Sequence, residues 1–193
     1  ENVLEETNSF VLHLTDSSDL GGLPESLIEM ASMEAKNRDK EGWIFTLHFP
    51  SYVPFMKYSE KRELRKTMLL AYSSRSFRGN EFDNSENVLK IVNLRLEIAR
   101  LLSFSNFAEL TLGDRMADTP EKVDLFLQKL FSASVNAAKR DFETIKKFAE
   151  GIGHTGSLER WDWAFYSELL RKKDYDIDDE ILKPYFRLEN VER

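Results

Sequence analysis

The sequence of 193 residues has no cysteine, only three histidines, and no long apolar run. The absence of cysteine excludes disulfide bonds and thiolate chemistry, and it suits a cytoplasm or a periplasm. No apolar run approaches the roughly 20 residues that a membrane-spanning helix needs. The net charge of −7 offers no basic surface for nucleic acid or for an anionic membrane. We therefore expect a globular protein that binds neither nucleic acid nor membrane, in the cytoplasm or alternatively the periplasm.

The three histidines do not form a known catalytic motif. A zinc hydrolase of the HExxH type needs two histidines four residues apart on a helix, with a glutamate beside the first. His13, His48 and His154 are separated by 35 and 106 residues, and none has an adjacent glutamate. His13 and His48 fall on two predicted strands and could hold a metal together with Asp16, but ordinary, partly buried side chains are the favoured interpretation. The sequence thus predicts no metal ligand and no catalytic residue in this chain.

Two further candidate sites are weak. No Gly-x-Ser-x-Gly motif is present to mark a serine nucleophile. The segment Gly151-Ile-Gly-His-Thr-Gly156 has the spacing of a dinucleotide-binding loop, which must follow a strand and open a helix. A helical pattern of about thirty residues precedes it instead. We interpret the segment as a loop that terminates a helix, with His154 as a solvated loop side chain.

The strongest helical pattern lies between residues 84 and 112. Its apolar residues recur mostly at three- and four-residue steps, and they are Val88, Ile91, Val92, Leu94, Ile98, Leu101 and Leu102. This spacing predicts a long amphipathic helix from about Glu86 to Phe104, followed by a short helix capped by Ser105. We expect the long helix to be buried along one side and covered by the helices before and after it.

The rest of the chain predicts a mainly α fold with a small two-stranded antiparallel sheet near the N-terminus. The two strands are expected at residues 10–14 and 43–49, which are rich in aromatic and β-branched residues. Pro50 and Pro54 predict that the segment between them has no regular structure and is extended or in a turn. Further helical segments are expected at residues 1–9, 24–37, 59–75, 120–150 and 157–172, with one short turn at 178–182.

An aromatic cluster at residues 160–168 is the most suggestive feature for function. Its members Trp161, Asp162, Phe165 and Tyr166 lie on a predicted helix. Indole and phenol groups combine apolar bulk with a polar group, so they suit a peptide-binding cleft. They suit a hydrophobic core as well, and the spacing alone favours the core.

Several segments in the same order resemble the thimet oligopeptidase family. The clearest is Asn93-Leu-Arg-Leu-Glu-Ile-Ala-Arg-Leu-Leu102 followed by Asn106-Phe-Ala-Glu109. A second is Trp161-Asp162-x-x-Phe165-Tyr166-x-Glu168, in which Phe165 stands where the family usually has a tyrosine. Weaker matches lie at residues 22–26, 42–47, 83–84, 116–121 and 184–191, and together they cover nearly the whole chain.

The resemblance implies a segment of a larger zinc metallopeptidase that cuts oligopeptides. The long loop before residue 85 and the ending Leu188–Val191 look most like the peptidyl-dipeptidases, which remove C-terminal dipeptides, and oligopeptidase A is the alternative. The family's zinc ligands and catalytic groups lie beyond this chain, so we expect the chain to be inactive alone and without zinc. Residues 1–58 would form a helix-plus-hairpin part and residues 59–193 a helical part of the segment.

The resemblance also gives the aromatic cluster a role, because Trp161, Asp162, Phe165 and Tyr166 would form part of the wall of the substrate cleft. A different hypothesis is a free-standing helical module whose aromatic faces bind a protein partner. The mass and metal content of the natural gene product would separate the two hypotheses.

Overall fold

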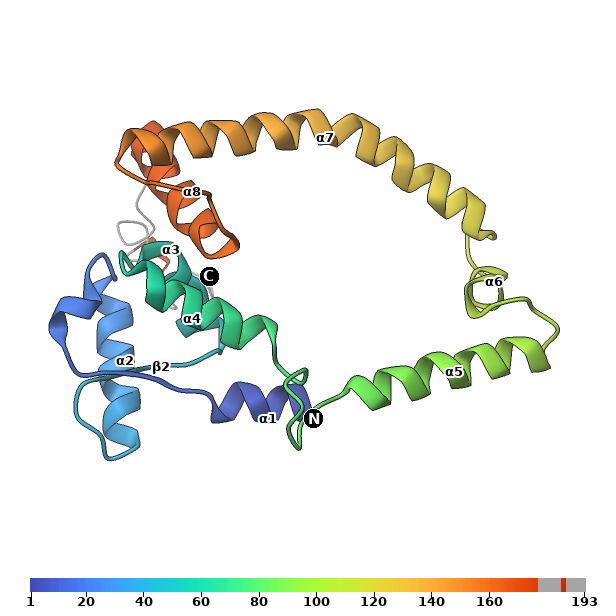
Figure 1. The fold of residues 1–193 in the computed structure, drawn as a ribbon, viewed down its shortest axis with the longest axis horizontal. Coiled ribbons are helices and arrows are strands. Elements are labelled where there is room, and N and C mark those ends of the chain that lie inside the picture. Colours follow the sequence, from blue (N-terminus) through green and yellow to red (C-terminus); the bar gives the residue numbers. More distant parts are fainter. Residues whose placement is uncertain (177–184, 187–193) are drawn as a thin grey trace. The chain divides into compact units, whose positions relative to one another are not determined.

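The computed structural model describes residues 1–176 and 185–186, and Figure 1 shows the order of their elements. The described residues form eight α-helices, one short 3-10 helix and one two-stranded antiparallel sheet, which confirms the predicted fold class. They group into two compact units: unit 1 is Glu1–Arg75 together with Ile145–Arg193, and unit 2 is Ser76–Thr144. None of the described helices is long and apolar enough to span a bilayer.

The first elements of unit 1 build the small sheet and cover it with a helix. Their bounds are α1 Asn2–Ser9, β1 Leu12–Leu14, η1 Ser17–Leu20, α2 Glu25–Asn37 and β2 Trp43–Phe45. The strands pair with Leu12 opposite Phe45 and Leu14 opposite Trp43. Both strands are shorter than the predicted ones, and α2 packs against β2. Gly42 turns the chain into β2 with a φ of +88°, where a side chain would collide with the Leu14 carbonyl oxygen.

Helix α3, Phe49–Tyr58, replaces the extended segment or turn that the two prolines predicted. Pro50 lies in the first helical turn, where a backbone N–H has no partner to lose. Pro54 lies inside the helix and removes one backbone hydrogen bond. Complete burial of Phe55 and near-complete burial of Met56 outweigh this loss. His48 therefore lies just before α3 rather than on a strand, which corrects its predicted position.

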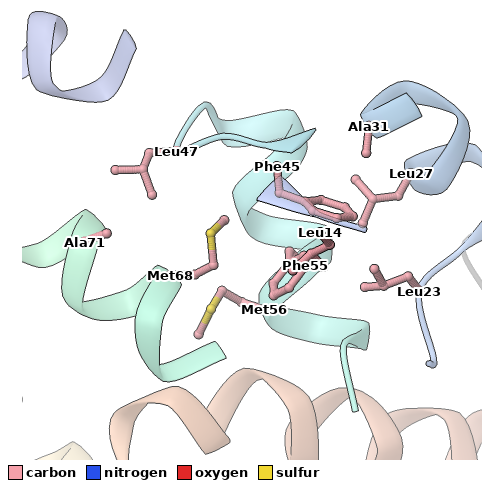
Figure 2. Packing of buried hydrophobic residues seen from close by; sticks show 10 residues of the cluster. All are labelled: Leu14, Leu23, Leu27, Ala31, Phe45, Leu47, Phe55, Met56, Met68 and Ala71. Carbon is pink, nitrogen blue, oxygen red and sulfur yellow. The ribbon is translucent and has the colours of Figure 1, made fainter. Parts of the chain in front are cut away.

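The main hydrophobic cluster of unit 1 joins the sheet to several of the unit's helices, and Figure 2 shows its side chains converging from several elements. The Phe45 and Phe55 rings meet edge to face with their centroids 4.7 Å apart. The members of the cluster are Leu14, Leu23, Leu27, Ala31, Phe45, Leu47, Phe55, Met56, Met68 and Ala71.

Two further helices of unit 1 pack against each other, namely α4, Arg62–Ser73, and α8, Arg160–Tyr175. Helix α4 begins three residues later than predicted, because Ser59 is the residue that ends α3. Helix α8 also begins three residues later than predicted and extends to Tyr175. The predicted turn at residues 178–182 lies outside the described residues.

Unit 2 contains α5, Ser85–Leu101, α6, Phe107–Leu112, and most of α7, Pro120–Gly151. The long helices fall close to their predicted positions, and α7 ends at Gly151 as expected. Asn106, not Ser105, caps α6, since its Oδ1 accepts a hydrogen bond from the Glu109 amide at 3.0 Å.

The predicted burial of α5 is not found among the residues that the structure describes. Ala99 is the one residue of the helix that is buried among the described residues. The large apolar side chains that were expected to face a core are 47–84% exposed, and they are Val88, Ile91, Val92, Leu94, Ile98, Leu101 and Leu102. The spacing of the apolar residues predicted the helix correctly. The same spacing does not tell which segments pack against the apolar side chains.

Candidate functional site: the contacts of helix α8

The candidate residues belong to α8, which lies against α3 and α4 in unit 1 (Figure 1). Its first turn is closed by a capping box between Glu159 and Asp162. In this box the Asp162 side chain accepts a hydrogen bond from the Glu159 amide at 3.1 Å. The box fixes the start of the helix and directs the Asp162 carboxylate toward α4.

Asp162 is completely buried and is bound by two arginines of α4. Arg62 donates through Nε and Nη2 to both carboxylate oxygens, at 2.8–3.1 Å. Arg65 donates through Nη2 to Oδ1 at 2.9 Å. Arg65 is only 1% exposed, and it donates further hydrogen bonds to the carbonyl oxygens of Trp161 and Ser59 at 2.9 and 2.7 Å. One carboxylate and two guanidinium groups thus connect the start of α8 to the start of α4.

The charge state of this contact follows from two opposing effects. Burial alone would raise the pKa of Asp162, but hydrogen bonds from Arg62, the Glu159 amide and Arg65 outweigh it and hold the pKa below its ordinary value. The hydrogen bond to Asp162 also raises the pKa of Arg62. The carboxylate therefore stays ionised at neutral pH and matches the buried charge of Arg65.

Tyr166 lies one turn after Asp162 and connects α8 to the glycine-rich loop. Its hydroxyl lies 3.0 Å from His154 Nδ1, and His154 Nε2 lies 3.2 Å from the Ser157 carbonyl oxygen. A carbonyl oxygen only accepts, so Nε2 carries the imidazole proton and Nδ1 accepts from the Tyr166 hydroxyl. Burial, together with the nearby Asp162 charge, raises the pKa of Tyr166. His154 is thus a half-buried, hydrogen-bonded partner of α8 rather than a freely solvated side chain.

Trp161 and Phe165 are half-buried, and both lie under cations from α4. The Arg65 guanidinium carbon is 4.2 Å from the Phe165 ring centroid. Arg62 and Lys66 lie 5.6 and 5.4 Å from the Trp161 ring centroid. The Trp161 indole Nε1 is buried and has no hydrogen-bond partner among the described residues.

Further along α8, Glu168 contacts helix α3. Its carboxylate pairs with Lys57 at 3.4 Å and accepts a hydrogen bond from the Tyr58 hydroxyl at 3.4 Å. Arg171, on the next turn of α8, donates to the same carboxylate. Asp162 and Glu168 are therefore two polar contact points along one helix.

The structure brings Asp162 and Tyr166 together as buried residues and leaves Trp161 and Phe165 at the edge of the core. Trp161 packs against the main hydrophobic cluster, and Phe165 packs against a smaller one formed by Ile145, Ala149 and Tyr166. These contacts agree with the core interpretation of the aromatic spacing. Whether the partly exposed faces of Trp161 and Phe165 also line a substrate cleft stays a prediction.

The histidines near the N-terminus and the glycine-rich segment, which the sequence offered as weaker candidates, do not form a metal site or a dinucleotide-binding loop among the described residues. His13 Nε2 lies 2.6 Å from the Glu41 carbonyl oxygen. Across the part of the chain that the structure describes, no three histidine, aspartate or glutamate side chains group so that they could hold a metal ion, and this includes His13, His48 and Asp16. The glycine-rich segment follows α7 directly, with Gly153 and Gly156 at positive φ, so it is a loop that terminates a helix, as expected.

Sequence reasoning missed the two arginines of α4. Arg62 and Arg65 lie in the segment 59–75 that was predicted to be helical, but no partner was predicted for either of them. A usable signal was present, because Arg65 lies three residues before Met68 on the apolar stripe of α4, and a charge on such a stripe needs a buried counter-charge.

The sequence is similar to known proteins of one family. Residues 55–193 match Peptidase family M3. The chain is 40% identical over 200 residues to the organellar oligopeptidase A, chloroplastic/mitochondrial, of Arabidopsis thaliana, covering 99% of this chain and 25% of that protein. It is 36% identical over 189 residues to oligopeptidase A of Escherichia coli, covering 96% of this chain and 28% of the relative.

A third relative is a dipeptidyl carboxypeptidase, the second kind of enzyme that the sequence motifs resemble. Dipeptidyl carboxypeptidase of Escherichia coli is 28% identical over 192 residues, covering 99% of this chain and 28% of that protein. The chain therefore spans about a quarter of the length of these curated relatives. The motif resemblance is confirmed, and because the family match covers well over half of its residues, the chain belongs to peptidase family M3, whose members are proteolytic hydrolases.

Proposed function

We propose that the chain is a segment of a longer zinc peptidase that hydrolyses oligopeptides, and that it contributes structure rather than catalytic groups. The observation that carries the proposal is the similarity to oligopeptidases A along 96–99% of the chain but only 25–28% of their length. The described residues do not fit a zinc site, because no three histidine, aspartate or glutamate side chains among them lie close enough together to hold a metal ion. The zinc chemistry of the longer enzyme is therefore assigned to none of them.

The test compares the isolated chain with the complete natural gene product. We expect no peptide hydrolysis by the isolated chain with added zinc, and hydrolysis that a chelator abolishes by the complete product. Turnover by the chain alone that a chelator abolishes would overturn the proposal. A natural product with a mass near the 22.5 kDa of this chain and no bound metal would instead favour the free-standing interaction module.

Within this proposal we favour an oligopeptidase A-like specificity. Its support is the higher identity to the two oligopeptidases A, 40% and 36%, than to the dipeptidyl carboxypeptidase, 28%. The peptidyl-dipeptidase remains a second candidate because that relative matches 99% of the chain and because the ending Leu188–Val191 resembles that group.

A pair of substrates separates the two specificities. An oligopeptide with a free C-terminal carboxylate and its C-terminally amidated copy would be incubated with the complete enzyme, and the products would be identified by mass spectrometry. An endopeptidase cuts both at internal bonds. A peptidyl-dipeptidase releases only dipeptides, and only from the peptide with the free carboxylate.

We also propose that α8 forms part of the cleft wall, with Asp162 and Tyr166 holding the helix and Trp161 and Phe165 facing the substrate. Trp161→Phe in the complete enzyme is the cleanest test, because it keeps an aromatic ring and removes an indole N–H that has no partner among the described residues. A wall role predicts a higher KM at an unchanged melting temperature. An unchanged KM for peptides of several lengths would contradict it.

A further inference from the structure

Helix α5 carries apolar side chains around roughly two thirds of its circumference at about 100° per residue. The polar arc is narrow, and it consists of Glu86, Lys90, Asn93, Glu97 and Arg100. Ser85, Asn87 and Arg95 interrupt the apolar arc, and the Arg95 guanidinium lies over the Phe107 ring at 5.2 Å. A surface helix needs an apolar stripe of only about 100°. The width of the arc on α5 therefore suits a helix that is enclosed on more than one side.

The exposed apolar residues of α5 include two groups that face different ways, and Ile91, which is 47% exposed, lies between them. One face contains Leu94, Ile98 and Leu101, which are 56%, 47% and 84% exposed. The other contains Val88 and Val92, which are 56% and 57% exposed. Residues 92 and 94 lie about 160° apart around the helix axis. One packed neighbour is therefore too few to cover both faces.

The contacts that α5 makes within unit 2 leave both faces open. Among the described residues its main neighbour is the short helix α6, and Ala99 is the one residue of α5 that becomes buried. Leaving this many large apolar side chains in water is costly, at about 25 cal/mol per Å² of apolar surface. A partner with apolar surface on two sides of the helix would remove that cost.

We propose that α5 is a core helix of the longer M3 peptidase and that apolar helices from the part of that polypeptide outside this chain pack on both of its faces. This inference rests on the proposed function, because it requires the longer polypeptide. Its second support is length, since this chain spans only 25–28% of its relatives and thus leaves about three times as much chain to supply neighbours.

A second copy of this chain fits the two faces less well. A two-fold dimer buries the same patch on each subunit, so it covers one face of α5 and leaves the opposite one in water. The two alternatives therefore differ in how many faces become protected, which labelling can measure directly.

The experiment uses the absence of native cysteine in this chain. Val92→Cys, Asn93→Cys and Leu94→Cys place single thiols at three consecutive positions, on one apolar face, on the polar arc and on the other apolar face. Each would be introduced into the isolated chain and into the complete enzyme, with any cysteine elsewhere in the enzyme replaced. The rate of reaction with a small maleimide would be measured at several protein concentrations.

In the complete enzyme we expect the thiols at 92 and 94 to react at least 100-fold more slowly than the thiol at 93. In the isolated chain we expect all three to react within about threefold of one another. Fast labelling at 92 or 94 in the complete enzyme would overturn the proposal. Protection of only one face in the isolated chain, increasing with concentration, would assign that face to a second copy and would also overturn it.

The readout is independent of peptidase activity, so the two proposals can fail separately. If the complete enzyme hydrolyses peptides but its thiols at 92 and 94 both react quickly, the proposed function stands and the proposed packing of α5 is wrong. If a cysteine variant does not fold, hydroxyl-radical footprinting of the unmodified proteins provides the same comparison. The apolar side chains of residues 88–102 should then be oxidised at least tenfold more slowly in the complete enzyme than in the isolated chain, and equal oxidation would overturn the proposal.

Discussion

The described residues of both units are mainly helical, but the two units bury their apolar residues to very different extents. Unit 1 encloses a core of ten residues, and its helix α8 is connected to α4 through a completely buried carboxylate. Unit 2 has a long helix of which Ala99 is the one buried residue. An apolar pattern thus specifies a helix in both units, but only in unit 1 do the unit's own described residues bury most of that pattern.

The chain offers separate probes for the two units. Its three tryptophans, Trp43, Trp161 and Trp163, all lie in unit 1. Tryptophan fluorescence therefore reports on unit 1, whereas far-UV circular dichroism reports on the helices of both.

The largest effect is expected from Asp162→Asn in unit 1. The variant keeps the shape of the side chain but leaves the buried Arg65 without a counter-charge, which should cost about 3–5 kcal/mol of unfolding free energy. The matched control is Asp118→Asn in unit 2, whose partner Lys122 is well exposed, and this should cost less than about 1 kcal/mol. Urea unfolding followed by fluorescence and by circular dichroism measures both. Equal losses for the two variants would show that the Asp162 network does not hold α8 in place.

A second pair truncates one leucine in each unit. Leu27 is 3% exposed in the core of unit 1, so Leu27→Ala should cost about 2–5 kcal/mol through lost burial and a cavity. Leu94 is 56% exposed on α5, and Leu94→Ala should change the stability of the isolated chain by less than about 1 kcal/mol, because alanine also favours a helix. A large loss for Leu94→Ala in the isolated, monomeric chain would mean that α5 is buried there after all.

A third pair tests backbone conformation at two glycines. Gly79 in unit 2 has a φ of +66° and open space around it, so Gly79→Ala should cost about 1–2 kcal/mol from the left-handed conformation alone. Gly42 in unit 1 has a φ of +88°, and an added Cβ would lie 2.3 Å from the Leu14 carbonyl oxygen. Gly42→Ala should therefore cost about 1–3 kcal/mol more than Gly79→Ala, because the packed strand cannot move away. Thermal unfolding by circular dichroism gives the comparison, and similar costs would contradict the close packing at Gly42.

Much of the secondary structure was predictable from the sequence, because helical period and turn residues are local signals. Helix α7 is the clearest case, with Pro120 at its start and Gly151 at its end. Helix α3 was missed because the rules for proline are also local, whereas the burial of Phe55 that stabilises the helix is a tertiary effect. The same limit applies to the site: the aromatic cluster was visible in the sequence, but the pairing of Asp162 with Arg65, 97 positions away, was not.

The smallest effect concerns pH and a carboxylate at the start of α5. The Asp83 side chain accepts hydrogen bonds from the Ser85 hydroxyl and from the amides of Gly79 and Ser85, which lower its pKa to about 2. A folded-state pKa below the unfolded value of 3.8 means that this stabilisation is complete above about pH 4. It is then lost as the pH falls through about 2. The pKa of Asp16 in unit 1 is also below its ordinary value, because its carboxylate accepts hydrogen bonds from Ser18.

Carbon-detected NMR titration of the Asp83 carboxyl measures this pKa directly. Amide exchange at the first turn of α5 should accelerate over the same pH range, and Asp83→Asn should remove that part of the pH dependence while leaving the titration of Asp16 unchanged. An Asp83 midpoint near 3.8 would show that the loop from Gly79 to Ser85 does not hold the carboxylate in solution. The start of α5 would then lack the local anchor that these hydrogen bonds to Asp83 provide.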